Sequence, residues 1–290
     1  MPRTRGEADV DSGCKPSPMI EEFLFPRGIR RIRLLLDSPP VRLSTGTNVP
    51  YEAQRATWLR QPWPWFAVAL ALTAFGFWPS FLSALPHKPA HILVHGLSAT
   101  VWMALPIVQG WLIAKRKRVL HRRIGYASVA LATVVVVSGL RVVQTMVLGD
   151  GNDGDLVTIK FVLLDLTGIG LFVAFLVMAI RATQRRDIAL HLRLMACTAI
   201  IPLEAANERT AILLLPQLVP NFSVALYASL LSMLAICAAL IIVEWRADRV
   251  RWPFPFMFGY YLVMYAIATP VALSPQFQAF SQWYARLGWW

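Results

Sequence analysis

The five histidines of the chain all lie near the ends of long apolar stretches. His91 and His95 are one helical turn apart in the segment PHKPAHILVH, and this spacing places both imidazoles on the same face of a helix. Two imidazoles at this spacing can bind one metal ion, whereas they cannot reach opposite faces of one haem. The pair therefore predicts a transition-metal site.

His121 and His191 are arranged differently, because they belong to two separate stretches. His121 precedes one apolar stretch in LHRRIGY, and His191 begins another in LHLRLM. Both stretches start at the same membrane surface in the topology derived below, so the two imidazoles are expected at similar depth. Two such helices can hold histidines on opposite faces of a haem. The pair predicts axial ligands of haem b, and the alternative for His121 is an interfacial residue among arginines.

Charged side chains also occur inside the apolar stretches, where an isolated charge is costly in lipid. These residues are Arg141, Lys160, Asp165, Glu204, Glu208 and Arg209. At about 1.5 Å rise per residue they lie in the middle or outer half of the bilayer, so charges of opposite sign are expected to pair. Arg141 and Asp165 are the predicted ion pair.

Three interpretations of these charges are open. They form an internal network that fixes helix packing, they form a proton or ion path, or Glu204 and Glu208 complete a metal site with His91 and His95. Glu204, Asn207 and Glu208 fall on one helical face. That face is expected to point into the protein.

The composition predicts the class of protein that holds these residues. The 290 residues are 57% apolar and only 15% charged, with a formal net charge of +12. A soluble domain usually has about a quarter charged residues, and one of this size cannot bury so much apolar surface. The chain is therefore predicted to be a membrane protein. Its basic residues occur in short clusters between apolar runs, so the expected partners are the bilayer and its anionic headgroups, with no nucleic acid.

Seven apolar stretches approach the roughly 20 residues that are needed to cross a hydrocarbon core. They predict an all-α, polytopic membrane helix bundle with spans at about 64–85, 91–114, 123–147, 157–181, 191–215, 222–244 and 253–274. The fifth span contains Glu204, Glu208 and Arg209, and their cost in the membrane must be offset by protein neighbours or water.

Every second connecting loop is basic, as in 115–118, 185–186 and 246–251, whereas the loop at 149–155 has three Asp residues and no base. Membrane proteins keep Lys and Arg on the cytoplasmic side. With seven spans, the N-terminus is therefore placed in the cytoplasm and the C-terminus outside a bacterial-type inner membrane. Residues 276–290 form a short aromatic tail that suits the outer membrane interface.

Residues 1–63 are polar, basic and rich in proline, and they contain no stretch long enough to cross a bilayer. They are expected to form a largely disordered cytoplasmic arm before the bundle of residues 64–275. Residues 23–36 mix Arg with Leu and Ile, so a segment that lies on the lipid surface is the alternative for that part of the arm. A start of the chain at Met19 is also open.

Three motifs follow one another in a defined order. They are His91-x3-His95 followed by Trp102 and Gln109, then Leu120-His121-Arg122-Arg123-x-Gly125, then His191-x-Arg193-Leu194-Met195. In this order they resemble a group of uncharacterised bacterial multi-pass membrane proteins over about residues 64–275, which implies a helix-bundle inner-membrane protein without a defined activity. The chain also resembles the six-helix cytochromes b, which move electrons across membranes with two pairs of histidines. Here the fourth span has no histidine, so the second pair is incomplete.

No Walker loop, GxGxxG, GxSxG or HExxH motif is present, so phosphate, dinucleotide and common hydrolase chemistries have no support in the sequence. The three cysteines form no CxxC pair, and no disulfide is expected. The leading hypothesis is a redox-associated inner-membrane protein that binds haem b or a metal and works beside a redox or respiratory partner. The alternatives are an ion-coupled transporter that uses the buried charges, and a non-catalytic factor that assists assembly of a respiratory complex.

Overall fold

The computed structural model describes residues 63–148 and 155–288, and these residues contain helices and no strand. The all-α prediction is therefore confirmed for this part of the chain, whereas the predicted arm of residues 1–63 lies outside it except for Trp63. In chain order the elements are α5 (Trp63–Phe77), the 3-10 helix η1 (Leu82–His87), α6 (Ala90–Ala114), α7 (Arg118–Leu148), α8 (Leu156–Gln184), α9 (Ile188–Ile200), α10 (Leu203–Leu214), α11 (Phe222–Trp245), α12 (Pro253–Leu273) and α13 (Pro275–Ala285).

Five of the described helices are long and apolar enough to cross a membrane, namely α6, α7, α8, α11 and α12. The bent pair of α9 and α10 adds a sixth if the two helices form one span. These helices coincide with six of the predicted spans, so a helical bundle with several long apolar helices is confirmed. The count of seven stays a prediction, because it depends on α5.

The first predicted span, 64–85, is wrong at its C-terminal end. α5 stops at Phe77 and is followed by a turn and by η1. Pro79 explains the stop, because proline has no backbone N–H and clashes with the preceding helical turn. The 15 described residues of α5 reach about 22 Å, which is less than the roughly 30 Å of a hydrocarbon core.

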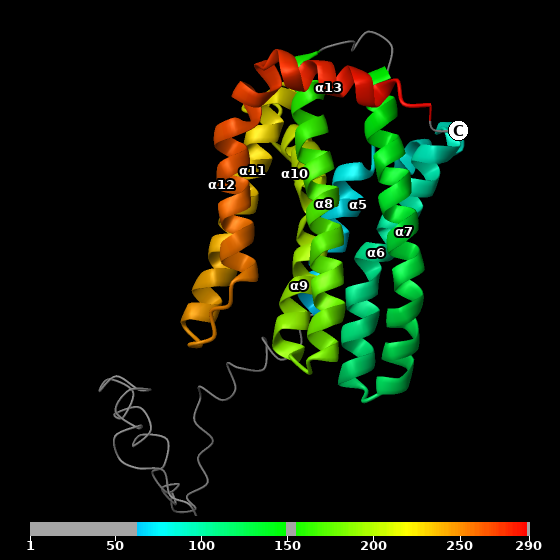
Figure 1. Ribbon diagram of the computed structural model, residues 1–290, viewed down its shortest axis with the longest axis vertical. Coiled ribbons are helices and arrows are strands. Elements are labelled where there is room, and N and C mark those ends of the chain that lie inside the picture. The colour runs from blue at the N-terminus through cyan, green and yellow to red at the C-terminus, as the bar shows by residue number, and fades with distance from the viewer. Residues whose placement is uncertain (1–62, 149–154, 289–290) are drawn as a thin grey trace, which may run out of the picture. The chain divides into compact units, whose positions relative to one another are not determined.

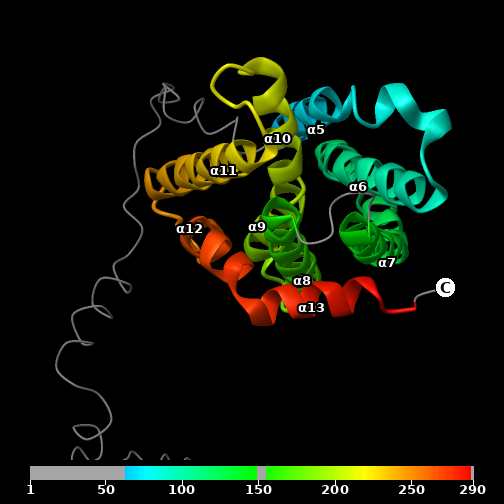
Figure 2. The same ribbon diagram turned by 90° about the horizontal axis from the view of Figure 1, so that it is seen from above.

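The fifth predicted span, 191–215, is a broken helix. α9 and α10 are bent by 42° at Ile201 and Pro202. Pro202 lacks the N–H that a continuous helix would donate to the carbonyl of Thr198. The bend changes the partners of the chain, since α9 lies against α8, whereas α10 lies against α5 and α11 (Figure 2).

The interior of the bundle lies where α8, α9, α11 and α12 meet. α8 packs against α9 and α12, and α11 packs against α12 (Figure 1). Leu194, Met233 and Tyr261 are almost completely buried in this core. α6 and α7 form a pair that joins the core through α8. Apolar side chains such as Leu231 and Leu262 remain exposed on the outside of the helices, as a surface that faces lipid requires.

The basic turns lie together at one end of the bundle. They follow α6, α8 and α11 and form the lower end in Figure 1. At this end Asp187 accepts a hydrogen bond from the Leu190 N–H at 3.0 Å and pairs with Arg251 at 2.6 Å. The Leu190 N–H, followed by Arg251, holds the pKa of the Asp187 carboxyl below its ordinary value. Arg193 and Glu244 form a second ion pair at 2.5 Å, which joins α9 to α11.

At the opposite end, α13 lies across the bundle and contacts α7, α8 and α12 (Figure 1). Gln144 of α7 donates from Nε2 to the carbonyl oxygens of Tyr284 and Ala285, at 3.3 and 3.2 Å. The predicted aromatic tail of residues 276–290 is therefore helical over most of its described length. Gln144 fixes the C-terminal end of this helix against α7.

Gly76 allows α5 to approach α10 closely, because a Cβ atom at this position would lie 2.6 Å from the carbonyl oxygen of Ala206. We expect Gly76→Ala to force the two helices apart and to lower the free energy of unfolding by about 1–3 kcal/mol. Thermal unfolding of the purified protein in detergent measures this loss. Gly170→Ala is the control, since a Cβ atom there meets nothing within 4 Å. Equal melting temperatures for the two variants would contradict the close approach.

Candidate functional site

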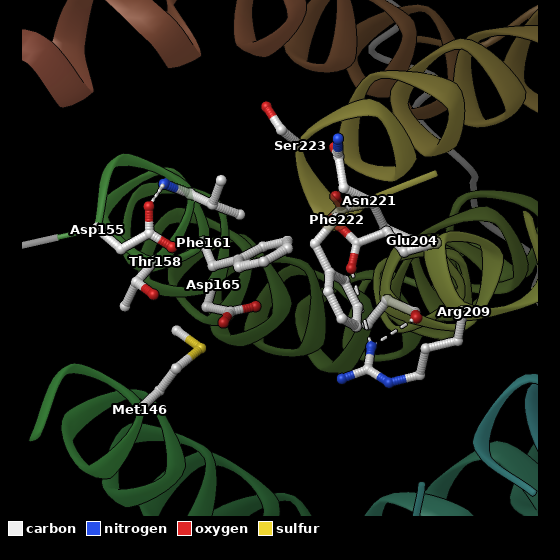
Figure 3. A pocket seen from close by; sticks show the side chains of 13 residues that line it. Met146, Asp155, Thr158, Phe161, Asp165, Glu204, Arg209, Asn221, Phe222 and Ser223 are labelled. Carbon is white, nitrogen blue, oxygen red and sulfur yellow. Dashed lines mark hydrogen bonds and ion pairs between the residues drawn. The ribbon is translucent and has the colours of Figure 1, made fainter. Parts of the chain in front are cut away.

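A cavity of about 660 Å³ lies between α8 and α10 (Figure 3). It exists because α10 turns away from α8 at Pro202 and packs against α5 and α11. Asp155, Asn221 and Phe222 line its outer part and are exposed, so within the described residues the cavity is open at the end opposite the basic turns. Asp165, which also lines it, is about 15 Å further along α8 than Asp155.

Three carboxylates line the inner part of the cavity. Asp165 belongs to α8, and Glu204 and Glu208 belong to α10. The Glu208 side chain is only 4% exposed, and the Oε1 atom of Glu204 is buried without a hydrogen-bond partner. The face of α10 that contains Glu204, Asn207 and Glu208 was predicted to point into the protein. This prediction is confirmed for Asn207 and Glu208, which are both buried. The two glutamates interact with each other and with Asp165.

Arg209 carries the positive charge among the residues that line the cavity. Its guanidinium donates to the carbonyl oxygen of Ala205 at 2.8 Å and lies 3.8 Å from Oε2 of Glu208. The same group lies over the Phe77 ring, 4.3 Å from the ring centroid. Asp165 interacts with it electrostatically across the cavity. These contacts hold the guanidinium on the side of the cavity that is covered by α5 (Figure 3).

The charges of the cavity are unequal, because its lining contains one arginine and four carboxylates, with Asp155 in the outer part. Ionised groups inside a membrane protein are tolerated where they pair or contact water, and the open cavity gives water access to them. Glu204 also lies in the first turn of α10, where the partial positive charge of the helix N-terminus stabilises a carboxylate. The arrangement can attract a cation or accept a proton.

The predicted ion pair between Arg141 and Asp165 is wrong. Arg141 donates to Oε1 of Gln144 on its own helix, whereas Asp165 faces the cavity. Similar depth does not bring the two side chains together, because depth does not fix the direction in which a helix presents a residue. Lys160, another member of the predicted charge cluster, is buried and lies over the Tyr227 ring at 5.1 Å.

The predicted metal site of His91, His95 and the α10 carboxylates is not formed. Nε2 of His91 lies 3.1 Å from Oγ1 of Thr145, and Nδ1 of His95 lies 3.3 Å from Oγ of Ser138. Both imidazoles therefore face α7, whereas the carboxylates of α10 face the cavity. In the described part of the chain, no group of three or more His, Cys, Asp or Glu residues is placed to hold a metal ion. The two histidines join α6 to α7 instead.

His121 and His191 lie close enough to interact electrostatically at the basic end of the bundle. The side-chain amide of Gln109 lies between His121 and Gly125. With its nitrogen toward His121, it donates to Nδ1 of that ring at 2.6 Å, and its oxygen accepts from the Gly125 N–H at 3.1 Å. Nδ1 of His191 lies 3.1 Å from the carbonyl oxygen of Ala179. The two imidazoles thus interact with each other, and haem binding stays a prediction.

Several residues that shape the cavity belong to no charged or histidine motif. Pro202 opens the space, Phe77 covers Arg209, and Phe161 and Phe222 form part of the wall. Pro202 is visible in the sequence as a proline inside a predicted span, which is a signal for a bend. The phenylalanines resemble any other apolar residues of a membrane helix, so only the fold identifies their role.

The chain was compared with protein families, curated proteins and solved structures, and none of them matches it. The resemblance to bacterial multi-pass membrane proteins therefore stays an expectation from the three sequence motifs. The function has to be argued from the geometry of the cavity and of the helices that surround it.

Proposed function

We propose that this protein is a multi-pass carrier of the inner membrane, in which the cavity binds a cationic solute or ion in exchange for protons. The observation that carries this proposal is the position of Asp165, Glu204 and Glu208 in an open cavity beside a broken helix. The long apolar helices around the cavity are compatible with an integral membrane protein.

The break between α9 and α10 supports a binding role. Broken helices occur at the substrate and ion sites of many transporters, because the freed backbone groups line a polar cavity there. In this chain, Oγ of Ser229 donates to the Glu204 carbonyl at 2.6 Å, and Asn207 donates to Oγ of Ser232 at 2.7 Å. These bonds anchor α10 to α11 and leave the Glu204 carboxylate available for a ligand.

The two glutamates support the exchange of a cation for a proton. Their carboxyl groups interact with each other, one turn apart on α10. Two carboxylates in such a position repel each other when both are ionised. A proton removes this repulsion, and so does a bound cation. The two ligands therefore compete for the same pair, which is the physical basis of coupling.

The distribution of charge favours one orientation. Basic turns are retained in the cytoplasm, and the turns after α6, α8 and α11 are basic. The cavity then opens to the outside, because it is open at the other end of the bundle. The C-terminus then lies outside, because α12 begins at a basic turn, and the N-terminus lies in the cytoplasm if α5 also crosses the membrane.

The carrier function is tested with purified protein in sealed liposomes that contain a pH-sensitive dye. Addition of Na⁺, K⁺ or choline outside is expected to raise the internal pH, because each cation that enters is exchanged for protons that the carboxylates carry from the lumen to the outside. Glu208→Gln is expected to slow this change by about tenfold, which corresponds to about 1.4 kcal/mol. An internal pH that is independent of the protein would contradict the carrier function.

Asp248→Asn is the matched control for Glu208→Gln. Asp248 is exposed in a basic turn, far from the lining of the cavity, and its substitution removes the same charge. Its φ of 48° lies in the left-handed region, which asparagine tolerates. We expect wild-type rates for this variant, and equal losses in both variants would argue against a specific role of the cavity.

The orientation is tested with reporters fused to Trp290 at the end of the full chain. Alkaline phosphatase, which is active outside the cytoplasm, is expected to work there, and green fluorescent protein is expected to stay dark. The reason is that α12 begins at a basic turn and ends on the opposite side of the membrane. A fluorescent fusion at Trp290 would mean that the bent pair of α9 and α10 does not cross the membrane.

Haem binding by His121 and His191 is the second candidate function, because the two imidazoles lie near each other. Nδ1 of His191 donates to the Ala179 carbonyl and leaves Nε2 for iron. Nδ1 of His121, in contrast, accepts from Gln109, so iron binding at His121 would require its proton to move from Nε2 to Nδ1. A bound haem would supply one-electron transfer. Neither histidine lines the cavity described above, which is why the carrier function is preferred.

A visible absorption spectrum of the purified protein decides the haem hypothesis. If haem b is present, the reduced-minus-oxidised spectrum shows its band, and His121→Ala or His191→Ala is expected to abolish it because each variant removes one axial ligand. His91→Ala is the control, since His91 faces Thr145 of α7, and it should retain the band. A band that survives in both single variants, or no band in the wild type, would refute the assignment.

A further inference from the structure

The walls of the cavity indicate which class of cation it accepts. Phe161 of α8 and Phe222 of α11 meet edge to face, with ring centroids 6.3 Å apart. Met146 and Val157 line the same region, so much of the wall is apolar or aromatic (Figure 3). A pocket that combines apolar walls with a few placed polar groups is typical of sites for small organic molecules.

An inorganic cation matches this arrangement poorly. Ca²⁺, for example, takes about six to eight oxygen ligands close around it. The described residues contain no group of three or more His, Cys, Asp or Glu residues placed for such an ion. The cavity volume of about 660 Å³ also lies within the range of roughly 300–1,000 Å³ that is usual for small-molecule sites.

The charges of the cavity indicate a positive ligand. Arg209 already contacts Glu208, the Ala205 carbonyl and the Phe77 ring, so its charge is compensated within the protein. Oε1 of Glu204 has no hydrogen-bond donor, and Asp165 faces it from the other wall. Phe161 and Phe222 line the cavity together with these two carboxylates (Figure 3).

We propose that the cavity binds an organic ammonium ion, an inference that rests on the proposed carrier function. The positive charge of the ligand pairs with Glu204 and Asp165, and its alkyl groups contact Phe161 and Phe222. Aromatic rings attract ammonium groups electrostatically, and exclusion of water strengthens this attraction. A neutral molecule of the same shape lacks both attractions.

Isothermal titration calorimetry on the full chain in detergent tests the ligand class. The probe is choline, and the neutral comparison is 3,3-dimethyl-1-butanol, which has nearly the same shape without the charge. We expect choline to bind and the neutral alcohol to bind more weakly by about tenfold or more. Butylammonium is the second probe. Equal affinities for choline and the alcohol, or no binding of either ammonium ion, would overturn the proposal.

Two substitutions locate the binding within the cavity. Glu204→Gln is expected to weaken choline binding by about tenfold or more, because it removes a charge partner. Phe222→Leu is expected to weaken it by about two- to fivefold, because it removes the ring and keeps the apolar bulk. Phe222 is 47% exposed, so its variant is expected to fold even if the Glu204 variant does not. If Phe222→Leu binds choline as tightly as the wild type does, and Glu204→Gln, where it folds, does the same, the proposal is overturned.

Each substitution has a matched control outside the cavity. Asp248→Asn removes a carboxylate at the basic end, and Phe280→Leu removes a partly exposed ring of α13. Neither residue lines the cavity. Both controls are expected to bind choline as the wild type does, and losses equal to those of the cavity variants would overturn the proposal.

The result distinguishes this inference from the carrier function itself. If Na⁺ or K⁺ changes the internal pH of the liposomes while choline and butylammonium do not bind, the ammonium inference is overturned and the carrier function stands. If no cation binds or changes the internal pH, both are overturned. Binding of choline that is weakened by Glu204→Gln and by Phe222→Leu supports both.

Discussion

The missing backbone N–H of Pro202 is the constraint on which the cavity depends. In a continuous helix the residue at this position would donate to the Thr198 carbonyl, and α10 would follow α8 as α9 does. Instead the chain bends by 42° and α10 packs against α5 and α11. The space that remains between α8 and α10 is the cavity, so carboxylates that are costly in lipid gain access to water.

Most of the bundle could be predicted from the length of its apolar stretches. A chain in a bilayer must satisfy every backbone N–H and C=O internally, so about 20 apolar residues have few alternatives to a helix. The prolines were harder to interpret. Pro79 and Pro202 lie at breaks, whereas α6 continues through Pro106 and α12 continues through Pro270. A proline in a membrane helix permits a break, and the surrounding packing decides whether one forms.

The candidate site was predictable only in part, because a sequence gives depth along a helix more readily than rotation about it. Periodicity within α10 correctly places Asn207 and Glu208 on an inward face. Periodicity within one helix does not show how that helix is rotated relative to a neighbouring helix. α7 presents Arg141 to Gln144, and α8 presents Asp165 to the cavity, although both charges lie at similar depth. The aromatic walls were missed because their residue types are common throughout membrane helices.

The two ends of the bundle differ in their relation to the cavity. Its exposed lining lies at the start of α8 and α11, whereas the core of α8, α9, α11 and α12 lies beneath it. Below this core, Arg193 pairs with Glu244, and the two side chains are only 13% and 10% exposed. Removing one partner of a buried pair leaves an uncompensated charge, which costs about 3–5 kcal/mol. The pair therefore joins α9 to α11 at the basic end, and the Pro202 bend places the carboxylates on the other side of the core, toward the open end of the cavity.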